Sequence, residues 1–162
     1  MTTVRVLLVD SSDDFLEGLA AWLELEPNVV MVGRARTGLE AIEQVDRLKP
    51  DLVVMDIGMS SMNGFEATRE IKALPGGPRV VLTTFHDSAA ARKQARAAGA
   101  DELIAKADVT NKLRALIESF ARTGRGAQTR APERFEPLES TDGVSSESQR
   151  RVSRPRRKEK GV

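Results

Sequence analysis

Four polar residues each stand at the end of a short apolar run or directly after one. Two are acids, Asp10 and Asp56, and the others are the hydroxyl residue Thr84 and the cation Lys106. Two acids held close together need a cation, and carboxylate oxygens suit Mg²⁺, which keeps several waters and bridges to phosphate. A lysine and a threonine suit the oxygens of an anion. If the four residues meet, they suit a carboxylate nucleophile that receives a phosphoryl group, with Mg²⁺ and Lys106 neutralising charge in the transition state.

The apolar runs belong to a regular alternation that extends to about residue 122. Each run is typical of a strand covered on both faces, and segments of helical periodicity separate the runs. Five such units in series predict an α/β fold with a doubly wound parallel sheet. In the strand order 2-1-3-4-5 the first and third strands are neighbours, so we expect Asp10 and Asp56 side by side at the carboxyl edge. The five predicted strands are Val4–Val9, Val29–Gly33, Leu52–Met55, Arg79–Thr83 and Glu102–Ala105.

Capping residues mark where the predicted helices begin. Asn63, with Glu66 three residues later, is the signature of a capping box. Ser11, with Asp14 three residues later, predicts a second one at the start of the first helix. The core side of that first helix is expected to hold the residues at helical spacing, which are Phe15, Leu19, Trp22 and Leu23.

The composition excludes several kinds of site and of segment. The 162 residues include no cysteine, which excludes disulfides, thiolate metal sites and a catalytic cysteine. The single histidine, His86, excludes a multi-histidine metal site, and we expect it to be solvated or locally hydrogen-bonded. No apolar run approaches the roughly 18 residues of a membrane helix, and the first run is too short for a signal peptide. We therefore expect a cytoplasmic protein without a membrane span.

The last part of the chain, residues 123–162, differs in composition from the rest. It carries 10 basic and 6 acidic residues, whereas residues 1–122 carry 15 and 18. It is rich in Gly, Pro, Ser, Thr and Glu, so we predict a disordered tail, too short for a helix-turn-helix output domain. The tail ends in a basic cluster at 150–160, which fits a solubilising extension, an acidic partner, an anionic membrane surface or nucleic acid. Nucleic-acid binding there would be non-specific and salt-dependent, because no aromatic residue interleaves the cluster.

Four blocks of sequence occur in the order and at the separations of a known family. VRVLLVD, VVMDIGMSSMNG, RVVLTTFHD and GADELIAK resemble the response-regulator receiver domain of two-component signalling. The resemblance covers roughly residues 4–120 and implies a CheY-like, flavodoxin-like (βα)5 domain at 1–122. It also implies a phosphorelay in which a sensor histidine kinase or a phosphotransfer protein donates the phosphoryl group.

The resemblance assigns a role to each polar residue. Asp56 would be the phosphoacceptor, and Asp10, Asp56 and the backbone carbonyl of Gly58 would bind Mg²⁺. Thr84 would close on the phosphoryl group and Lys106 would pair with it. Thr84 fits the family better than its neighbour Thr83, since its distances along the chain to Gly99 and Lys106 match.

The chain departs from the family pattern at four positions. Ser11 replaces a second acid that is usually a direct metal ligand, so Ser11 is at most a weak one and Mg²⁺ affinity should fall. Leu103 occupies the position of the aromatic switch residue, which puts the usual switching relay in doubt. Ser60 and Ala107 stand where prolines are common.

Partners and competing functions follow from the same comparison. Output would be a contact with an unknown downstream protein, or with a second copy of the chain, through the fourth helix, fifth strand and fifth helix. Such a protein is not a metabolic enzyme. The main alternative is a degenerate receiver, never phosphorylated, that acts as a constitutive interaction module. A hydrolase with an aspartate nucleophile would want an acid where Gly58 stands, and a DNA-binding regulator would have to act through the tail.

Overall fold

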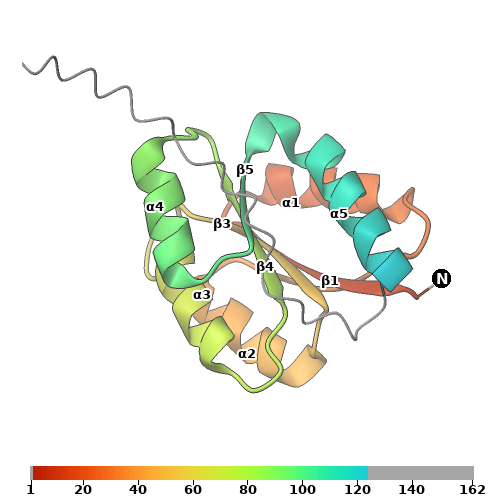
Figure 1. Ribbon diagram of the computed structural model, residues 1–162, viewed down its shortest axis with the longest axis horizontal. Coiled ribbons are helices and arrows are strands. Elements are labelled where there is room, and N and C mark those ends of the chain that lie inside the picture. Colours follow the sequence, from red (N-terminus) through yellow and green to blue (C-terminus); the bar gives the residue numbers. More distant parts are fainter. Residues whose placement is uncertain (1, 124–162) are drawn as a thin grey trace, which may run out of the picture.

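A computed structural model describes residues 2–123 of the chain. In this part, five parallel strands form one sheet in the order β2-β1-β3-β4-β5, and a helix follows each strand (Figure 1). The strands are β1 (Val4–Val9), β2 (Val29–Ala35), β3 (Leu52–Asp56), β4 (Arg79–Thr84) and β5 (Glu102–Ala105). The helices are α1 (Asp13–Glu24), α2 (Gly38–Leu48), α3 (Gly64–Ala73), α4 (Ala89–Ala98) and α5 (Val109–Thr123), with a 3-10 turn, η1 (Lys106–Asp108), before α5. The predicted fold class and strand order are confirmed.

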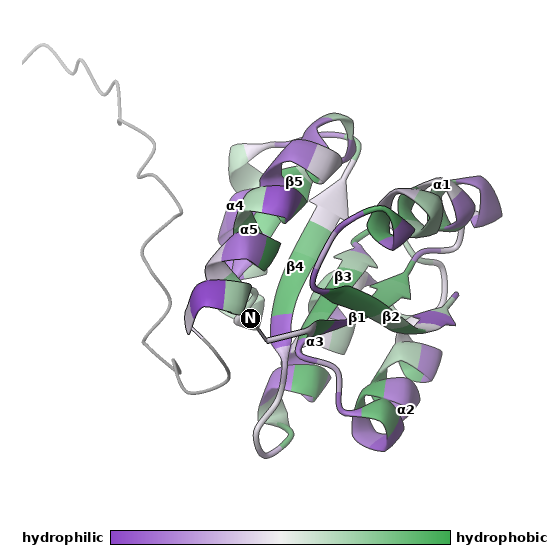
Figure 2. Cartoon of the chain, turned by 90° about the vertical axis from the view of Figure 1, so that its right-hand side faces the viewer, coloured by the Kyte–Doolittle hydropathy of each residue, from purple (hydrophilic) through white to green (hydrophobic). Residues whose placement is uncertain are grey.

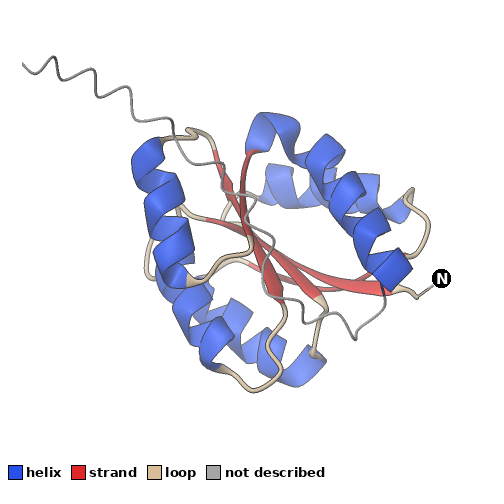
Figure 3. Cartoon of the chain, in the orientation of Figure 1, coloured by secondary structure: helices blue, strands red, loops and turns tan. Residues whose placement is uncertain are grey.

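Two layers of helices cover the sheet, which explains why the strands are apolar on both faces (Figure 3). Alternate strand residues point to opposite faces. One set packs with α2, α3 and α4, and its members from the strands include Leu7, Val9, Val53, Met55, Val80, Leu82 and Leu103. The other set packs with α1 and α5 and includes Val6, Leu8, Val54, Val81 and Ile104. Figure 2 shows the hydrophobic strands enclosed by helices that carry their hydrophilic residues mainly on the outside.

The helix starts agree with the predicted caps at α3 and differ at α1. At α3, Glu66 N donates to Asn63 Oδ1 (2.9 Å) and Asn63 N donates to the Glu66 carboxylate (3.2 Å), so the capping box is confirmed. At α1 the cap is Ser12, whose hydroxyl accepts from Phe15 N, and the prediction of Ser11 was wrong. The reason is Asp10, whose carboxylate accepts from Ser12 N (2.8 Å) and delays the helix by one residue.

The first helix also buries a slightly different set of residues from the one that its spacing predicts. Leu19 and Leu23 are fully buried, but Phe15 and Trp22 are only partly buried at the edge of the core. Leu16, which the spacing did not predict as a core residue, is buried in the core instead. The apolar face of α1 is therefore turned by one residue, and Phe15 becomes available to the carboxyl edge of the sheet.

Helix α5 is the last element among the described residues. Helix α5 continues to Thr123, one residue beyond the predicted end of the ordered part. The predicted disordered tail and its basic cluster at 150–160 lie outside the described residues. Among residues 2–123, no helix is both long enough and apolar enough to span a membrane.

Candidate functional site

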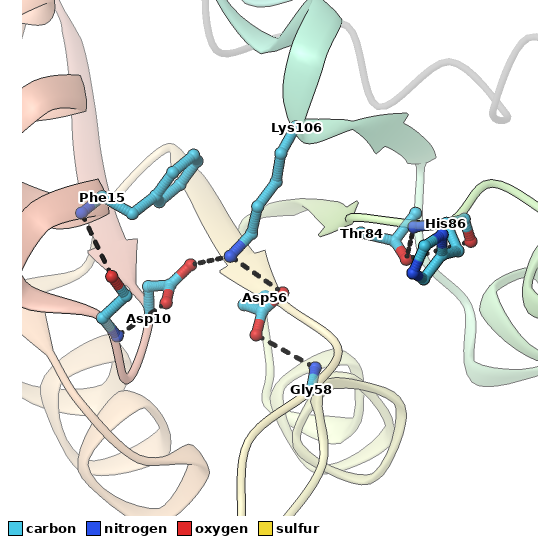
Figure 4. Close-up of polar contacts among 8 residues, drawn as sticks. Asp10, Phe15, Asp56, Gly58, Thr84, His86 and Lys106 are labelled. Atoms are coloured by element: carbon cyan, nitrogen blue, oxygen red, sulfur yellow. Dashed lines mark hydrogen bonds and ion pairs between the residues drawn. The ribbon is translucent and has the colours of Figure 1, made fainter.

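Three of the four predicted polar residues meet at the carboxyl edge of the sheet (Figure 4). Asp10 directly follows β1, Asp56 ends β3, and Lys106 directly follows β5. All three are buried, with 1%, 6% and 8% of their surfaces exposed. Charged residues are almost never buried to this degree unless they are paired, so this edge carries a specific charged cluster.

The register of the sheet explains why these side chains converge. Leu8 on β1 pairs with Val54 on β3, and both pack on the face that α1 and α5 cover. Asp10 and Asp56 come two residues further along, so they project to the same face from adjacent positions. Lys106 comes two residues after Ile104, which belongs to that face as well. Strand order and alternation thus place two acids and one cation together.

Lys106 joins the two carboxylates. Its Nζ lies 2.7 Å from Asp10 Oδ2 and 3.4 Å from Asp56 Oδ1. The rings of Phe15 and Phe85 each have their centroid 4.3 Å from the same ammonium. Aromatic faces attract a cation, so the rings add to the stabilisation of Lys106. The cluster of two acids and one base keeps a net negative charge.

Backbone amides hold the second oxygen of each carboxylate. Ser12 N donates to Asp10 Oδ1, as described above, and Gly58 N donates to Asp56 Oδ2 at 3.1 Å. Gly58 lies two residues after Asp56, and a Cβ at this position would come within 3.3 Å of Asp56 Oδ2. The loop after β3 therefore approaches the Asp56 carboxylate closely, and a side chain at Gly58 would require this carboxylate to shift by a few tenths of an ångström.

The environment of Asp56 raises the pKa of its carboxyl group above the ordinary 3.8. Burial is the largest cause, because it disfavours the charged form, and the neighbouring Asp10 acts in the same direction. The charge of Lys106 and the hydrogen bonds from Lys106 and Gly58 N oppose the rise. Asp56 is thus a carboxylate that lacks full solvation, which suits a nucleophile.

The raised pKa of Asp56 predicts how stability depends on pH. A folded-state pKa above the unfolded value means that the folded protein binds the proton more tightly, so stability falls as the pH rises from 3.8 through the folded-state value. Asp56→Asn removes this titration and leaves Lys106 paired with Asp10. We expect Asp56→Asn to raise the melting temperature near neutral pH and to lose this advantage in acid. Melting curves of both proteins across this pH range check it, and an advantage that is constant with pH would contradict it.

Thr84, the fourth predicted residue, lies apart from the charged cluster. Its hydroxyl donates to the His86 carbonyl and accepts from His86 N, both at 3.1 Å (Figure 4). Thr84 follows Leu82 by two residues and so projects from the face that α2, α3 and α4 cover. Leu103, at the predicted switch position, is 3% exposed and packs in the core on that face beside its register partner Leu82.

The carboxylates at this edge supply oxygen ligands that fit a hard divalent cation, although the site contains fewer than three acids. Asp10 and Asp56 supply carboxylates, and the cluster with Lys106 is negative overall, which favours a cation that keeps several waters. Ser11 is exposed and neutral. Among residues 2–123 no group of three or more acids, histidines or cysteines is close enough to hold a metal. The set therefore suits Mg²⁺ with a reduced number of protein ligands.

Sequence reasoning missed three residues of this edge: Phe15, Phe85 and Thr83. The two rings contact Lys106 across elements that are far apart in the chain, and nothing in their spacing indicates it. Thr83 is the register partner of Asp56. Alternation along β4, counted from Val81, would have placed Thr83 on the same face as Asp56.

The chain matches one protein family over most of the described residues. Residues 6–118 match the response regulator receiver domain. Response regulator protein VraR from Staphylococcus aureus (strain Mu3 / ATCC 700698) is 34% identical over 132 residues, which cover 81% of this chain and 61% of that protein. The chain thus spans less than two thirds of the length of this relative.

Solved structures of receiver domains have the same fold. The signal receiver domain of the putative response regulator NarL from Mycobacterium tuberculosis is 28% identical, with a TM-score of 0.69, and the match covers 76% of this chain and all of that one. The response regulator domain of Thermotoga maritima CheB is 31% identical, with a TM-score of 0.66, over 75% of this chain and 98% of that one.

The fold, the charged edge and these likenesses define the class: the chain is a CheY-like signalling domain. It belongs to the response regulator receiver domain family of two-component systems. The family membership that the four sequence blocks predicted is confirmed.

Proposed function

We propose that this chain is a phosphoacceptor in a two-component phosphorelay of the cytoplasm, and that Asp56 receives the phosphoryl group. The donor is a sensor histidine kinase or a phosphotransfer protein. The observation that carries the proposal is the buried Asp56 carboxylate, which has a raised pKa and lies between Lys106 and the Gly58 amide. Family membership supports the same chemistry.

Phosphoryl transfer at this site needs a nucleophile and charge neutralisation. An Asp56 oxygen attacks phosphorus, an O–P bond forms, and the P–N bond to the donor imidazole breaks. The imidazole keeps the electron pair and takes up a proton. Lys106, already within 3.4 Å of Asp56, neutralises charge on the phosphoryl oxygens. Mg²⁺ held by Asp10, Asp56 and the Gly58 carbonyl would neutralise further charge on these oxygens.

Phosphorylation would alter the surface near β4 and β5. The Thr84 hydroxyl is held by His86 on the opposite face of the sheet from Asp56, so it would reach the phosphoryl group only by leaving these bonds as the loop after β4 changes conformation, and this favours one of two conformations of that loop. Leu103 has no polar atom and is buried, so the switch operates without a hydrogen-bonding aromatic side chain. The readout is a contact of α4, β5 and α5 with a downstream protein or with a second copy of the chain.

Intact mass tests the proposal directly. The full chain and Asp56→Asn are incubated with Mg²⁺ and a small acyl phosphate, which donates its phosphoryl group by cleavage of its P–O bond. We expect one added phosphoryl group on the natural chain and none on Asp56→Asn. Equal addition to both proteins, or none to either with acyl phosphate and with phosphorylated histidine kinase, would contradict it.

A second candidate function is the degenerate receiver, a constitutive interaction module. Two observations favour it: the neutral, exposed Ser11 beside Asp10, and the buried Leu103 at the switch position. It predicts that Asp56→Asn leaves partner binding unchanged.

Ser11→Asp distinguishes the two functions by its effect on Mg²⁺ binding. A new carboxylate beside Asp10 supplies a third acid, so we expect Mg²⁺ to bind at least about tenfold more tightly. Calorimetric titration with Mg²⁺ measures this, with Ser12→Asp as the matched control, whose side chain caps α1. A large gain would mean that the natural chain has lost a metal ligand, which favours the degenerate receiver. The same affinity in Ser11→Asp and the natural chain would mean that another group already serves as the ligand, which favours the phosphoacceptor.

A further inference from the structure

A hollow of about 290 Å³ lies at the amino edge of the sheet, the edge opposite Asp56. The residues around it come from the starts of β1 and β4, the segment between α2 and β3, the loop between α3 and β4, and α5. Its apolar lining comes from Val4, Val45, Leu74 and Phe120. Leu74 and Phe120 are only partly buried, so an apolar group placed in the hollow would remove their exposed surface from water.

The loop between α3 and β4 gives the hollow a fixed wall. Its sequence is Pro75-Gly76-Gly77-Pro78, and each proline fixes its own φ. Gly76 has a φ of 63°, which favours glycine, and Gly77 N donates to the Leu74 carbonyl at 3.2 Å. The wall is thus formed before anything enters the hollow, which lowers the entropic cost of binding there.

Two cations stand at the rim of the hollow. Lys49 forms an exposed pair with Asp46, and the Cζ of Arg79 lies 4.3 Å from the centroid of the Phe120 ring. Exposed pairs are weak, so Lys49 still attracts other acids. Asp51, the one acid among these described lining residues, accepts a hydrogen bond from a backbone N–H at 2.9 Å. The rim therefore favours an apolar side chain that has acids beside it.

The chain leaves the described region beside this hollow. Phe120 lines the hollow, and Thr123, about one turn of α5 later, is the last described residue (Figure 1). Residues 124–162 therefore start at the rim. A tail segment that fits the hollow is held near it at an effective concentration of the order of millimolar, so even a weak contact is populated.

One segment of residues 124–162 combines apolar side chains with acids. Residues 133–139 read ERFEPLE, with three acids and one arginine. Phe135 is the only aromatic residue after Phe120, and Leu138 follows it by three positions. The twelve residues from Thr123 to Phe135 span about 20 Å as a flexible chain, so Phe135 can return to the hollow.

We propose that residues 133–139 dock into this hollow of the same chain, with the Phe135 ring inside it and the neighbouring glutamates at Lys49 and Arg79. An aromatic ring has a large apolar surface to bury there, and the charges of segment and rim are complementary. The hollow is at the edge opposite Asp56, so the docked segment leaves the acceptor accessible. It also gives the basic cluster at 150–160 a fixed origin at the amino edge.

Disulfide trapping tests this contact in the full chain, which has no cysteine of its own. Pro75→Cys places a thiol on the exposed part of the rim, and Pro137→Cys places a second thiol two residues after Phe135 without removing an acid. In dilute protein under mild oxidation, we expect the internal disulfide to form at least about tenfold faster than in a control pair, because docking raises the effective concentration of the two thiols.

The control pair combines Pro137→Cys with Pro27→Cys. Pro27 is also an exposed proline at the amino edge, in the loop between α1 and β2. Helix α5 contacts this loop through the ion pair of Arg114 with Glu26, so the tail starts near both positions. Only the Pro75 pair tests the hollow itself.

Substitution of Phe135 tests whether its ring is the group that docks. In the chain with Pro75→Cys and Pro137→Cys, Phe135→Ser should slow the disulfide to the rate of the control pair, and Phe135→Leu should keep most of the acceleration. Equal rates in the two pairs, or no effect of Phe135→Ser, would overturn the proposal. Disulfide-linked dimers that outpace the internal bond and rise with protein concentration would assign the hollow to a second copy, and would overturn docking within one chain.

Discussion

Lys106→Met is expected to lower the free energy of unfolding by about 3 kcal/mol near neutral pH, because it leaves two buried carboxylates without a cation. Lys106 lies 2.7 Å from Asp10 and 3.4 Å from Asp56, and all three residues are buried. Methionine keeps most of the alkyl chain, so the loss reports on charge. Urea unfolding of the natural chain and the variant measures it.

The dependence of this loss on pH separates charge from packing. Lys106 lowers the pKa of Asp56 against the effect of burial, so its removal should raise that pKa further. The folded variant then binds protons more tightly than the unfolded variant. The difference in free energy of unfolding between the natural chain and Lys106→Met should therefore shrink as the pH falls. Lys49→Met, at an exposed pair with Asp46, is the control and should change stability by less than about 0.5 kcal/mol. A Lys106→Met deficit that is the same in acid would assign it to packing.

Gly64→Ala is expected to cost about 3 kcal/mol and to displace the loop that carries Gly58. Gly64 is the first residue of α3, and its N–H donates to the Ile57 carbonyl at 3.1 Å. A Cβ at Gly64 would lie 2.5 Å from the backbone oxygen of Asp56 and 2.8 Å from the Ile57 Cα. These are backbone atoms of the site itself, so the clash cannot be relieved by rotating a side chain.

Gly18→Ala provides the matched control for Gly64→Ala. Gly18 lies inside α1, and a Cβ there would meet nothing within 4 Å. Alanine is the better helix former, so this variant should gain up to about 1 kcal/mol. Thermal and urea unfolding of both variants measure the contrast. If Gly64→Ala is as stable as the natural chain and is phosphorylated as fast, α3 does not approach the Asp56 backbone as closely as described.

The sheet and the convergence of its acids could be predicted because both follow from local patterns. Apolar runs of strand length that alternate with helical segments define a parallel sheet, and the carboxyl ends of parallel strands share one edge. Asp10, Asp56 and Lys106 each stand at such an end, so their meeting required only the strand order. The cap at Asn63 was equally predictable, since both of its hydrogen bonds lie within four residues.

The rest of the site depends on contacts that a pattern does not encode. The Thr84 hydroxyl is held by the His86 backbone, which depends on the path of the loop after β4. Phe15 reaches Lys106 because the Asp10 carboxylate delays the start of α1 and turns the helix. Thr83 is a partial exception: its face follows from alternation, but the lack of a partner for its hydroxyl depends on the packing of the core.

The central claim, that Asp56 is the phosphoacceptor, is tested most directly by locating the phosphoryl group. Borohydride reduces an aspartyl phosphate to homoserine and leaves an unmodified aspartate intact. The full chain is phosphorylated with acyl phosphate and Mg²⁺, reduced, digested and sequenced by tandem mass spectrometry. The account predicts homoserine in place of Asp56, and at no other acid. Homoserine at Asp10 or elsewhere, with Asp56 unreduced in a phosphorylated chain, would contradict it.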